Sequence, residues 1–152
     1  MIKKKKILHS QFKFNLIPFL FFVILVGCNR KIPEYTETDS QAILNPDYSS
    51  ITIPPNIAPL NFRIMDKADL YLARFYNNEG TEFMVRSKNG EIKIPDKKWK
   101  ELLKISGSGE YSIDIFARNS GEFTKYQTIT NKISQEPIDK YLVYRLIEPG
   151  FE

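Results

Sequence analysis

The run Tyr-Ser-Ile-Asp-Ile-Phe-Ala-Arg at residues 111–118 changes polarity at nearly every step. One set of alternate side chains comprises Tyr111, Ile113, Ile115 and Ala117, and the other comprises Ser112, Asp114, Phe116 and Arg118. Alternation with a period of two is typical of a β-strand that has one face in a core. The same period recurs at residues 60–64, 82–86, 91–94, 124–130 and 141–147, and residues 70–76 are apolar on both faces.

Turns separate these runs, and they contain the glycine and asparagine residues that tight turns need. They lie at residues 77–80, 88–90, 106–109 and 119–121. Asn89-Gly90 between two alternating runs predicts a hairpin, because a type I′ turn requires positive φ at both central positions. Seven or so short strands with regular turn spacing predict an all-β chain, specifically an immunoglobulin-like β-sandwich.

One short helix is predicted to interrupt the strands after Pro95-Asp96. Trp99, Leu102 and Leu103 are spaced i, i+3 and i+4, which gives a helix a single apolar face. Trp99 therefore has two interpretations. It is either a core residue beneath the edge of a sheet, which we favour, or a platform for a ligand.

The amino terminus has the pattern of a bacterial lipoprotein signal peptide. Four lysines, Lys3 to Lys6, precede an apolar run of eleven residues at 16–26. That run is shorter than the ~20 residues that a spanning helix needs, and it resembles a secretory signal. Its end, Leu25-Val26-Gly27-Cys28, is similar to a lipobox. We therefore predict lipidation of Cys28; the alternative is a buried structural cysteine.

This interpretation divides the chain into a signal peptide at 1–27, a flexible tether at 28–50 and a β-sandwich domain at 51–152. Residues 1–27 hold five lysines and no acidic residue, so the mature part has 22 − 5 = 17 basic and 18 acidic residues, a net charge of −1. A nucleic-acid-binding domain usually has a basic excess of its own. We therefore expect no nucleic-acid partner.

The mature sequence also lacks the side chains of several common catalytic sites. Cys28 is the only cysteine of the chain and His9, in the signal peptide, is the only histidine. A Ser-His-Asp or Cys-His nucleophile cannot be assembled without histidine, and a zinc site would need carboxylates alone. We expect no enzyme activity, no metal and no cofactor. Asp66 and Asp69 are a carboxylate pair of the kind that a glycosidase-like mechanism uses. They lie in a predicted turn, where aspartate is common for its backbone hydrogen bonds, and we favour that role.

Two segments are candidates for partner binding. The first is the proline-rich run at 51–59, where Pro54, Pro55 and Asn56 either offer a docking edge for another chain by β-addition or simply fix the start of the domain. The second comprises Tyr141, Tyr144 and Arg145, which form either an aromatic and basic surface for a glycan or peptide or a set of half-buried packing residues. We favour the packing interpretation for both.

The segments at 53–62 and 136–152, together with Trp99 in Lys-Lys-Trp-Lys, resemble the amino-terminal region of a family of Bacteroidota-type envelope lipoproteins. Such proteins usually carry a TolB-like, WD-repeat-like β-propeller downstream. Some have a CxxCH motif and are labelled cytochrome c biosynthesis proteins. The resemblance implies that relatives continue beyond Glu152. We therefore expect a truncated gene product; the alternatives are a fragment of a split reading frame and a stand-alone domain. No CxxCH is present here, so the resemblance does not extend to haem binding.

These observations predict a lipid-anchored, non-enzymatic domain of the cell envelope with a binding or scaffolding role. Its partners would be a membrane, through the lipid anchor, and an envelope protein. We expect it at the outer membrane, facing the periplasm. Two alternatives remain, a carbohydrate-binding module with exposed aromatic side chains, and an accessory factor in haem-protein maturation, which rests on the family resemblance alone.

Overall fold

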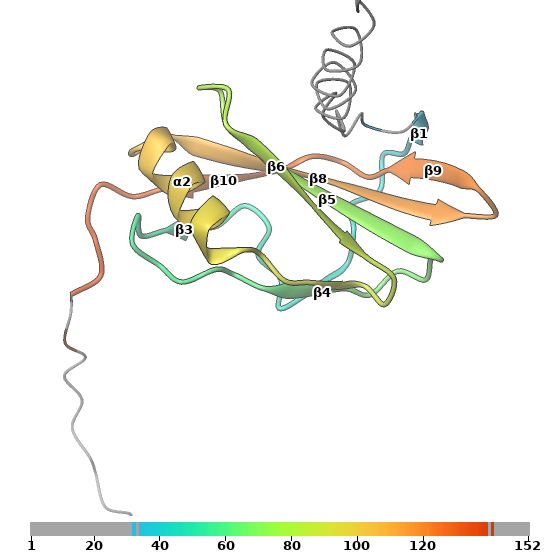
Figure 1. Cartoon of the computed structure of the whole chain (residues 1–152), viewed down its shortest axis with the longest axis horizontal. Helices are drawn as coiled ribbons and strands as arrows, with labels where there is room; N and C mark the ends of the chain where they lie inside the picture. Colours follow the sequence, from blue (N-terminus) through green and yellow to red (C-terminus); the bar gives the residue numbers. More distant parts are fainter. Residues whose placement is uncertain (1–31, 33, 140, 142–152) are drawn as a thin grey trace, which may run out of the picture. The chain divides into compact units, whose positions relative to one another are not determined.

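The computed structural model describes residues 32, 34–139 and 141 (Figure 1). Within these residues the chain forms ten strands and one helix, which confirms the prediction of an all-β chain with one short helix. The elements are β1 (Tyr35–Glu37), β2 (Leu44–Asn45), β3 (Thr52–Ile53), β4 (Phe62–Ile64), β5 (Leu70–Tyr76), β6 (Glu82–Ser87), β7 (Glu91–Ile92), α2 (Asp96–Ser106), β8 (Glu110–Asn119), β9 (Glu122–Lys125) and β10 (Ile129–Ile133).

Strand β8 is the centre of a large sheet. One of its edges pairs antiparallel with β5, which in turn pairs with β6. Its other edge is long enough for two partners: the first half pairs with β10 and the second half with β9, both antiparallel. Two short strands complete this side, with β1 parallel to β9 and β3 parallel to β10. The run at 111–118, whose alternation predicted a strand most clearly, therefore lies in β8, the strand that pairs with the most others.

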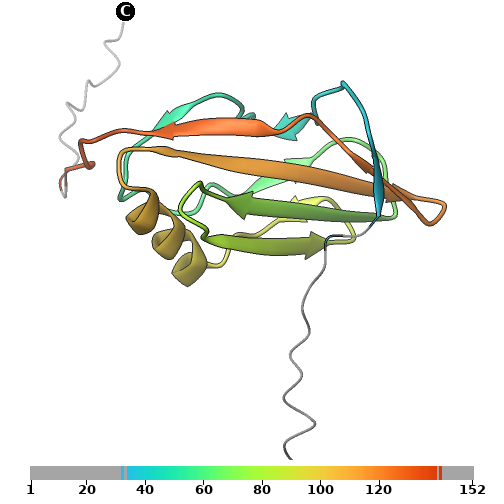
Figure 2. The ribbon, with the colours of Figure 1, turned by 90° about the horizontal axis from the view of Figure 1, so that it is seen from above.

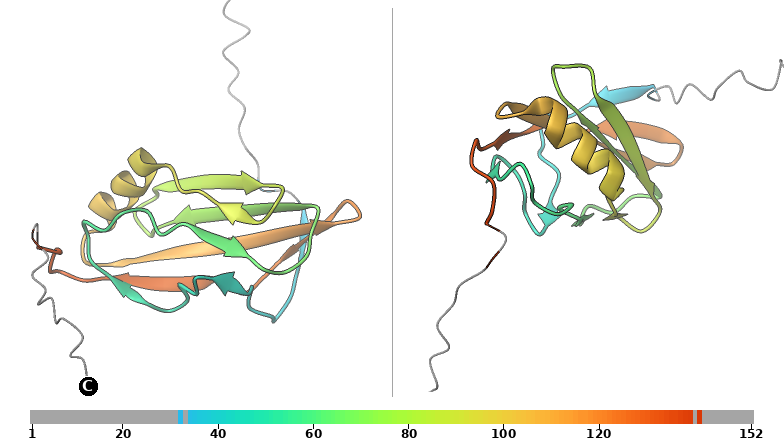
Figure 3. Two further views of the ribbon diagram at one scale, coloured as in Figure 1. Left: turned by 90° about the horizontal axis from the view of Figure 1, so that it is seen from below. Right: turned by 60° about the vertical axis from the view of Figure 1, so that its left-hand side comes forward.

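A small sheet of three short strands faces the large one. Its order is β2-β4-β7, with both pairs antiparallel. Seen from below in the left panel of Figure 3, the small sheet lies in front of the large sheet. The core between them takes alternate residues from each, such as Phe62 and Ile64 from β4 and Ile113 and Ile115 from β8. The alternation in the sequence predicted this inner face.

The predicted hairpin at Asn89-Gly90 is wrong. Strand β6 pairs with β5, whereas β7 pairs with β4 of the other sheet, so the chain crosses between sheets at residues 88–90. Gly90 is needed there for two other reasons. Its φ is +81°, and a Cβ at this position would lie 2.6 Å from the carbonyl oxygen of Ile64. Asn89-Gly90, which suits a tight hairpin turn, is thus used here where the backbone of Gly90 approaches that of Ile64 closely.

Helix α2 was predicted correctly. It begins after Pro95 and buries Trp99, Leu102 and Leu103, the three residues at helical spacing. Trp99 has no exposed surface; its ring meets Tyr111 edge to face at 5.4 Å, and its Nε1 donates to the carbonyl oxygen of Ile57 at 3.0 Å. Trp99 is therefore a core residue, as we favoured. Among the residues that the structure describes, no helix combines the length and apolarity of a membrane span.

The prediction of a flexible tether over 28–50 is wrong from Tyr35 onward. Strand β1 pairs with β9, β2 pairs with β4, and Ala42 and Leu44 are buried in the core. The error arose because this stretch is polar and its strands have only two or three residues, too few to show a period. Residues 28–31 and 33 lie outside the described residues, as does the predicted strand at 141–147 except for Tyr141.

The predicted run at 124–130 is divided into two strands. Strand β9 ends at Lys125 and β10 begins at Ile129, with the backbone of Tyr126 bonded to Ile115 and that of Gln127 bonded to Ser40. This break lets one edge of β8 accept both strands. It also brings the Thr128 side chain beside β8, where it joins the polar contacts described below.

The two ends of the folded domain differ in the elements that form them. The hairpin end comprises the β8–β9 turn at 119–121, the β4–β5 loop at 65–69 and the β6–β7 crossing at 87–90. The Ser120 amide joins the first two by a hydrogen bond of 3.3 Å to the Asp69 carboxylate. The helix end comprises α2, the turn at 54–57 and Ile138. The turned ribbon shows the chain leaving β10 past the helix end (Figure 2).

Candidate functional site

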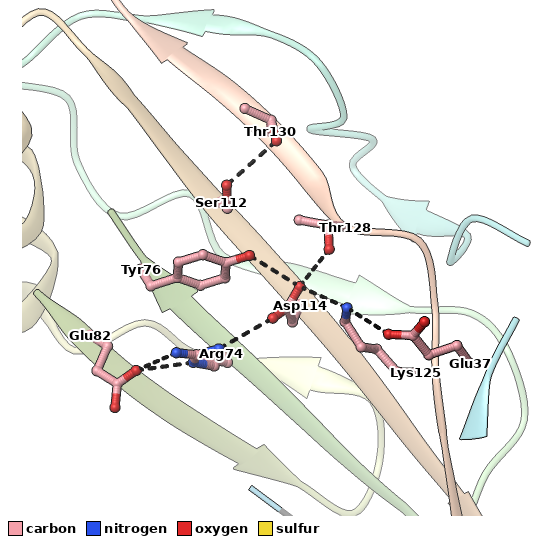
Figure 4. A network of polar contacts seen from close by, with 9 residues as sticks. All are labelled: Glu37, Arg74, Tyr76, Glu82, Ser112, Asp114, Lys125, Thr128 and Thr130. Atoms are coloured by element: carbon pink, nitrogen blue, oxygen red, sulfur yellow. Dashed lines mark hydrogen bonds and ion pairs between the residues drawn. The ribbon is translucent and has the colours of Figure 1, made fainter. Parts of the chain in front are cut away.

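The outer face of the large sheet carries the main cluster of charged side chains among the described residues (Figure 4). Its centre is Asp114 on β8, whose side chain is only 5% exposed. The neighbouring outward positions of β8 are Ser112 and Phe116, because alternate residues of a strand share a face. A carboxylate buried on an otherwise outward face needs partners to offset its desolvation.

Asp114 has four side-chain partners from three directions. Thr128 donates its hydroxyl to Oδ1 at 2.7 Å, and the Tyr76 hydroxyl lies 3.5 Å from the same oxygen. Arg74 approaches Oδ2 at 3.5 Å from β5, and Lys125 approaches Oδ1 at 3.8 Å from β9. Arg74 is directly opposite Asp114 in the β5–β8 register, so the pairing of these strands sets this contact.

Both cations have a second carboxylate on their outer side. Arg74 binds Glu82 of β6 through Nη2 at 2.6 Å, and Lys125 binds Glu37 of β1 at 3.3 Å. Burial lowers the pKa of Arg74, but its hydrogen bond and ion pair with Glu82 outweigh this effect, so its pKa is raised overall. Burial also lowers the pKa of Lys125, and the charges of Asp114 and Glu37 again raise it above its ordinary value.

This network is a set of ion pairs and hydrogen bonds that stabilises the sheet by linking neighbouring strands. It links β6, β5, β8, β9 and β1 through alternating charges, and in the described part of the chain no buried side-chain nitrogen or oxygen lacks a hydrogen-bond partner. Cations already held by two carboxylates each are poor proton donors. The described residues also contain no group of three or more His, Cys, Asp or Glu side chains placed to hold a metal ion.

Pro54, Pro55 and Asn56 form a turn at the helix end. Both prolines are half-buried, and the Ile57 amide donates to the Pro54 carbonyl oxygen at 3.3 Å. The Asn56 side chain donates to the Ile138 carbonyl oxygen at 2.8 Å and accepts from the Ile138 amide at 2.7 Å. These contacts with the domain itself support the packing interpretation for this segment.

The other predicted site residues are not brought together in the described structure. Tyr141 is 84% exposed, so it is not a packing residue there, and Tyr144 and Arg145 lie outside the described residues. Cys28 also lies outside them. Asp66 and Asp69 each accept a backbone amide, from Ile43 at 2.9 Å and Ser120 at 3.3 Å, which is the turn role that the sequence suggested.

Sequence reasoning missed a buried polar cluster at the helix end. Asn131 is fully buried; it donates to the Tyr48 carbonyl oxygen at 2.9 Å and to the Tyr111 hydroxyl at 3.0 Å, and it accepts from the Ile51 amide at 3.0 Å. These residues are up to 83 positions apart in the chain. The register of β8 with β10 places Asn131 opposite Tyr111. The pairing of β3 with β10 brings the preceding residues Tyr48 and Ile51 to the same side chain.

It also missed an exposed apolar pair on the small sheet. Ile43 is 62% and Met65 50% exposed, and the Met65 amide donates to the Ile43 carbonyl oxygen at 2.8 Å. Their neighbours Leu44 and Ile64 pair in the β2–β4 register and face the core, so Ile43 and Met65 share the outer face. An isolated exposed aliphatic residue is ordinary, but two on the same face of paired segments form a small apolar patch.

Comparisons with known proteins found no matching protein-family model, no matching curated protein and no matching solved structure. The resemblance to envelope lipoproteins therefore stays a prediction.

Proposed function

We propose that this chain is a lipid-anchored envelope protein whose folded domain has a non-enzymatic, scaffolding role. The observation that carries the proposal is the amino-terminal pattern: a basic segment, a short apolar run, and Gly27-Cys28 at its end. Acyl chains on Cys28 would hold the domain at a membrane, because two or more chains anchor stably whereas one binds marginally. The outer membrane, on its periplasmic face, is the location that we propose.

The scaffolding role is supported by how the domain uses its polar groups. The charges around Asp114 are paired with one another across five strands, so they stabilise the sheet. The mature sequence has no histidine and no cysteine other than Cys28. Such a domain is suited to hold an envelope protein near the membrane.

For the fold, we propose an immunoglobulin-like sandwich. The support is the order of strands: β2-β4-β7 faces a sheet in which β3, β10, β8, β5 and β6 are successive neighbours. An immunoglobulin-like domain likewise has its first, second and fifth strands in one sheet and its third, sixth and seventh in the other. The fourth strand here, β6, lies beside β5 in the second of these sheets, as strand C′ does in variable-type domains. In this assignment β9 and β10 together are the last strand, interrupted at residues 126–128.

The carbohydrate-binding alternative requires exposed, coplanar aromatic side chains. Trp99 is fully buried. The most exposed tyrosines of the described residues are Tyr35, at 40%, and Tyr141, at 84%. Tyr35 pairs with Phe123 near the hairpin end, whereas Tyr141 follows Ile138 at the helix end. They do not form one surface, so we do not propose this function.

Intact-mass analysis of the membrane-extracted protein tests the proposal. The full chain is produced in a bacterial host that processes lipoproteins, beside the matched variant Cys28→Ser. We expect the wild-type mass to equal residues 28–152 plus acyl groups, and the variant to keep Met1 and carry no lipid. A wild-type product that keeps Met1 and has no added lipid would reject the anchor.

A further inference from the structure

The length of chain between the predicted anchor and the domain restricts where the domain can be. Cys28 and Tyr35 are seven residues apart, and seven extended residues span at most ~25 Å. Tyr35 is already part of the folded domain, because it pairs with Phe123 of β9. Its ring also meets Phe116 of β8 at 5.2 Å, which fixes β1 against the large sheet. The tether is thus much shorter than the sequence alone suggested.

The chain enters and leaves the domain in different places. It enters near the hairpin end, since Phe123 is two residues after the β8–β9 turn. It leaves at the helix end, where Asn56 holds Ile138 by two hydrogen bonds. Strand β8 runs between the two ends and has ten residues, a length of ~33 Å. The proposed anchor at Cys28 is at most ~25 Å from Tyr35, so we expect the hairpin end to lie nearer the membrane than the helix end.

The hairpin end also presents the exposed apolar pair, Ile43 and Met65. Met65 begins the β4–β5 loop, and the next residue, Asp66, binds the Ile43 amide through its carboxylate. Further along the small sheet the outward positions are charged, with Arg63 ion-paired to Glu91. The apolar character of the outer face is thus concentrated at its hairpin end, where aliphatic side chains can enter the interfacial layer of a bilayer.

The charges of the hairpin end do not favour binding to an anionic membrane. The loops at 65–69, 87–90 and 118–122 contain three cations and three carboxylates, namely Lys67, Lys88, Arg118, Asp66, Asp69 and Glu122. Balanced charges give little attraction to anionic headgroups, and what remains is screened within a Debye length of ~8–10 Å. Contact with a bilayer would therefore depend on the apolar pair and the anchor.

We propose that the hairpin end rests on the bilayer surface, with Ile43 and Met65 at the lipid interface and the helix end directed away from it. This orientation rests on the proposed lipidation of Cys28. The domain then holds Ile138, at the helix end, away from the membrane. In this orientation the Ile43 and Met65 side chains contact lipid.

Fluorescence quenching by lipids brominated in their acyl chains tests the orientation. The full-length lipoprotein is reconstituted in phosphatidylcholine vesicles as Ile43→Cys or as Ile105→Cys, each labelled with a small thiol-reactive dye. Ile105 is a matched control, since it is an isoleucine with 46% exposure on α2, at the helix end. We expect quenching at position 43 to exceed that at 105 by roughly threefold or more, because interfacial groups lie ~5–10 Å into the boundary layer. High salt should not change it.

The number of dyes per chain separates the two proposals. An acylated Cys28 is a thioether and takes no dye, so we expect one dye per chain for the anchored protein. Two dyes per chain mean that Cys28 is free, which rejects the anchor and with it the orientation. One dye per chain with equal quenching at 43 and 105 rejects the orientation alone. Adding Met65→Ser to the labelled Ile43→Cys protein should reduce quenching; unchanged quenching would overturn the role of the apolar pair.

Discussion

The helix end and the hairpin end of the domain differ in what their side chains contact. At the helix end, Trp99, Tyr111 and Asn131 are buried and bonded to one another or to the backbone. At the hairpin end, Ile43 and Met65 are largely exposed although both are apolar. The helix end therefore contributes mainly to stability. The helix end also has exposed apolar side chains, Ile105 at 46% and Ile138 at 50%. The hairpin end is the better candidate for contact with a membrane because it is nearer in the chain to the proposed anchor at Cys28.

The largest effect should come from Trp99. Replacing it with alanine removes the largest fully buried side chain, and we expect a loss of about 3–5 kcal/mol in the free energy of unfolding. Urea denaturation followed by circular dichroism measures this loss. Trp99→Phe is the control, because it keeps most of the packing and loses the hydrogen bond to Ile57. A loss under about 1 kcal/mol for Trp99→Ala would show that the helix end is not the stable one.

The inner face of the domain was predictable from sequence because local spacing alone determines it. Strand β8, helix α2 and the burial of Trp99 follow from periods of two and of about 3.6 residues. The crossing at Gly90 was not, because a glycine that approaches Ile64 and a glycine in a hairpin have the same sequence pattern. The distinction depends on which strands pair, and that is decided by contacts far apart in the chain.

The outer face was predictable only in part. Alternation indicated that Asp114 points outward, and Arg74, Lys125 and Glu37 have charges of suitable sign. No spacing rule, however, connects Glu37 to Lys125, which are 88 residues apart. Such partners are brought together by strand register, and register is set by the whole core rather than by the charged residues.

A second effect, specific to the helix end, should appear at high pH. Burial raises the pKa of Tyr111 from 10.0 to about 12, and the hydrogen bond from Asn131 acts in the opposite direction. In the unfolded chain this phenol ionises near pH 10, whereas in the folded domain it stays neutral. Its contribution to stability is therefore complete below pH 10 and is lost as the pH rises toward about 12.

The pKa difference of about two corresponds to about 2–3 kcal/mol. Urea denaturation at several values of pH between 9 and 12 would show it as a falling free energy of unfolding. Tyr111→Phe should flatten this fall. Tyr126→Phe is the control, since Tyr126 is only half-buried although burial raises its pKa too. The same steep fall in Tyr111→Phe and in the wild type would contradict the assignment.

The network between the two ends should have a smaller effect. Asp114→Ala leaves Arg74 and Lys125 without their shared carboxylate and removes the partner of Thr128. We expect a loss of about 2 kcal/mol, less than for a fully buried ion pair, because both cations are partly exposed and keep a second carboxylate. Thermal unfolding at neutral pH measures it, with Asp114→Asn as the variant that keeps a hydrogen-bond acceptor. If Asp114→Asn were as stable as the wild type, the charge of Asp114 would have no role in the network.

The smallest effect concerns the point where the chain leaves the domain, and it compares the two ends directly. Asn56→Ala removes both hydrogen bonds to Ile138, and we expect a loss of about 1 kcal/mol, because exposed hydrogen bonds contribute less than buried ones. Hydrogen exchange should become faster at residues 134–139 and stay unchanged in β9. Ile43→Ser at the hairpin end is the control, with an expected change within about 0.5 kcal/mol. If Ile43→Ser cost more than Asn56→Ala, the hairpin end would be part of the stable core, and its exposed pair would need no membrane to explain it.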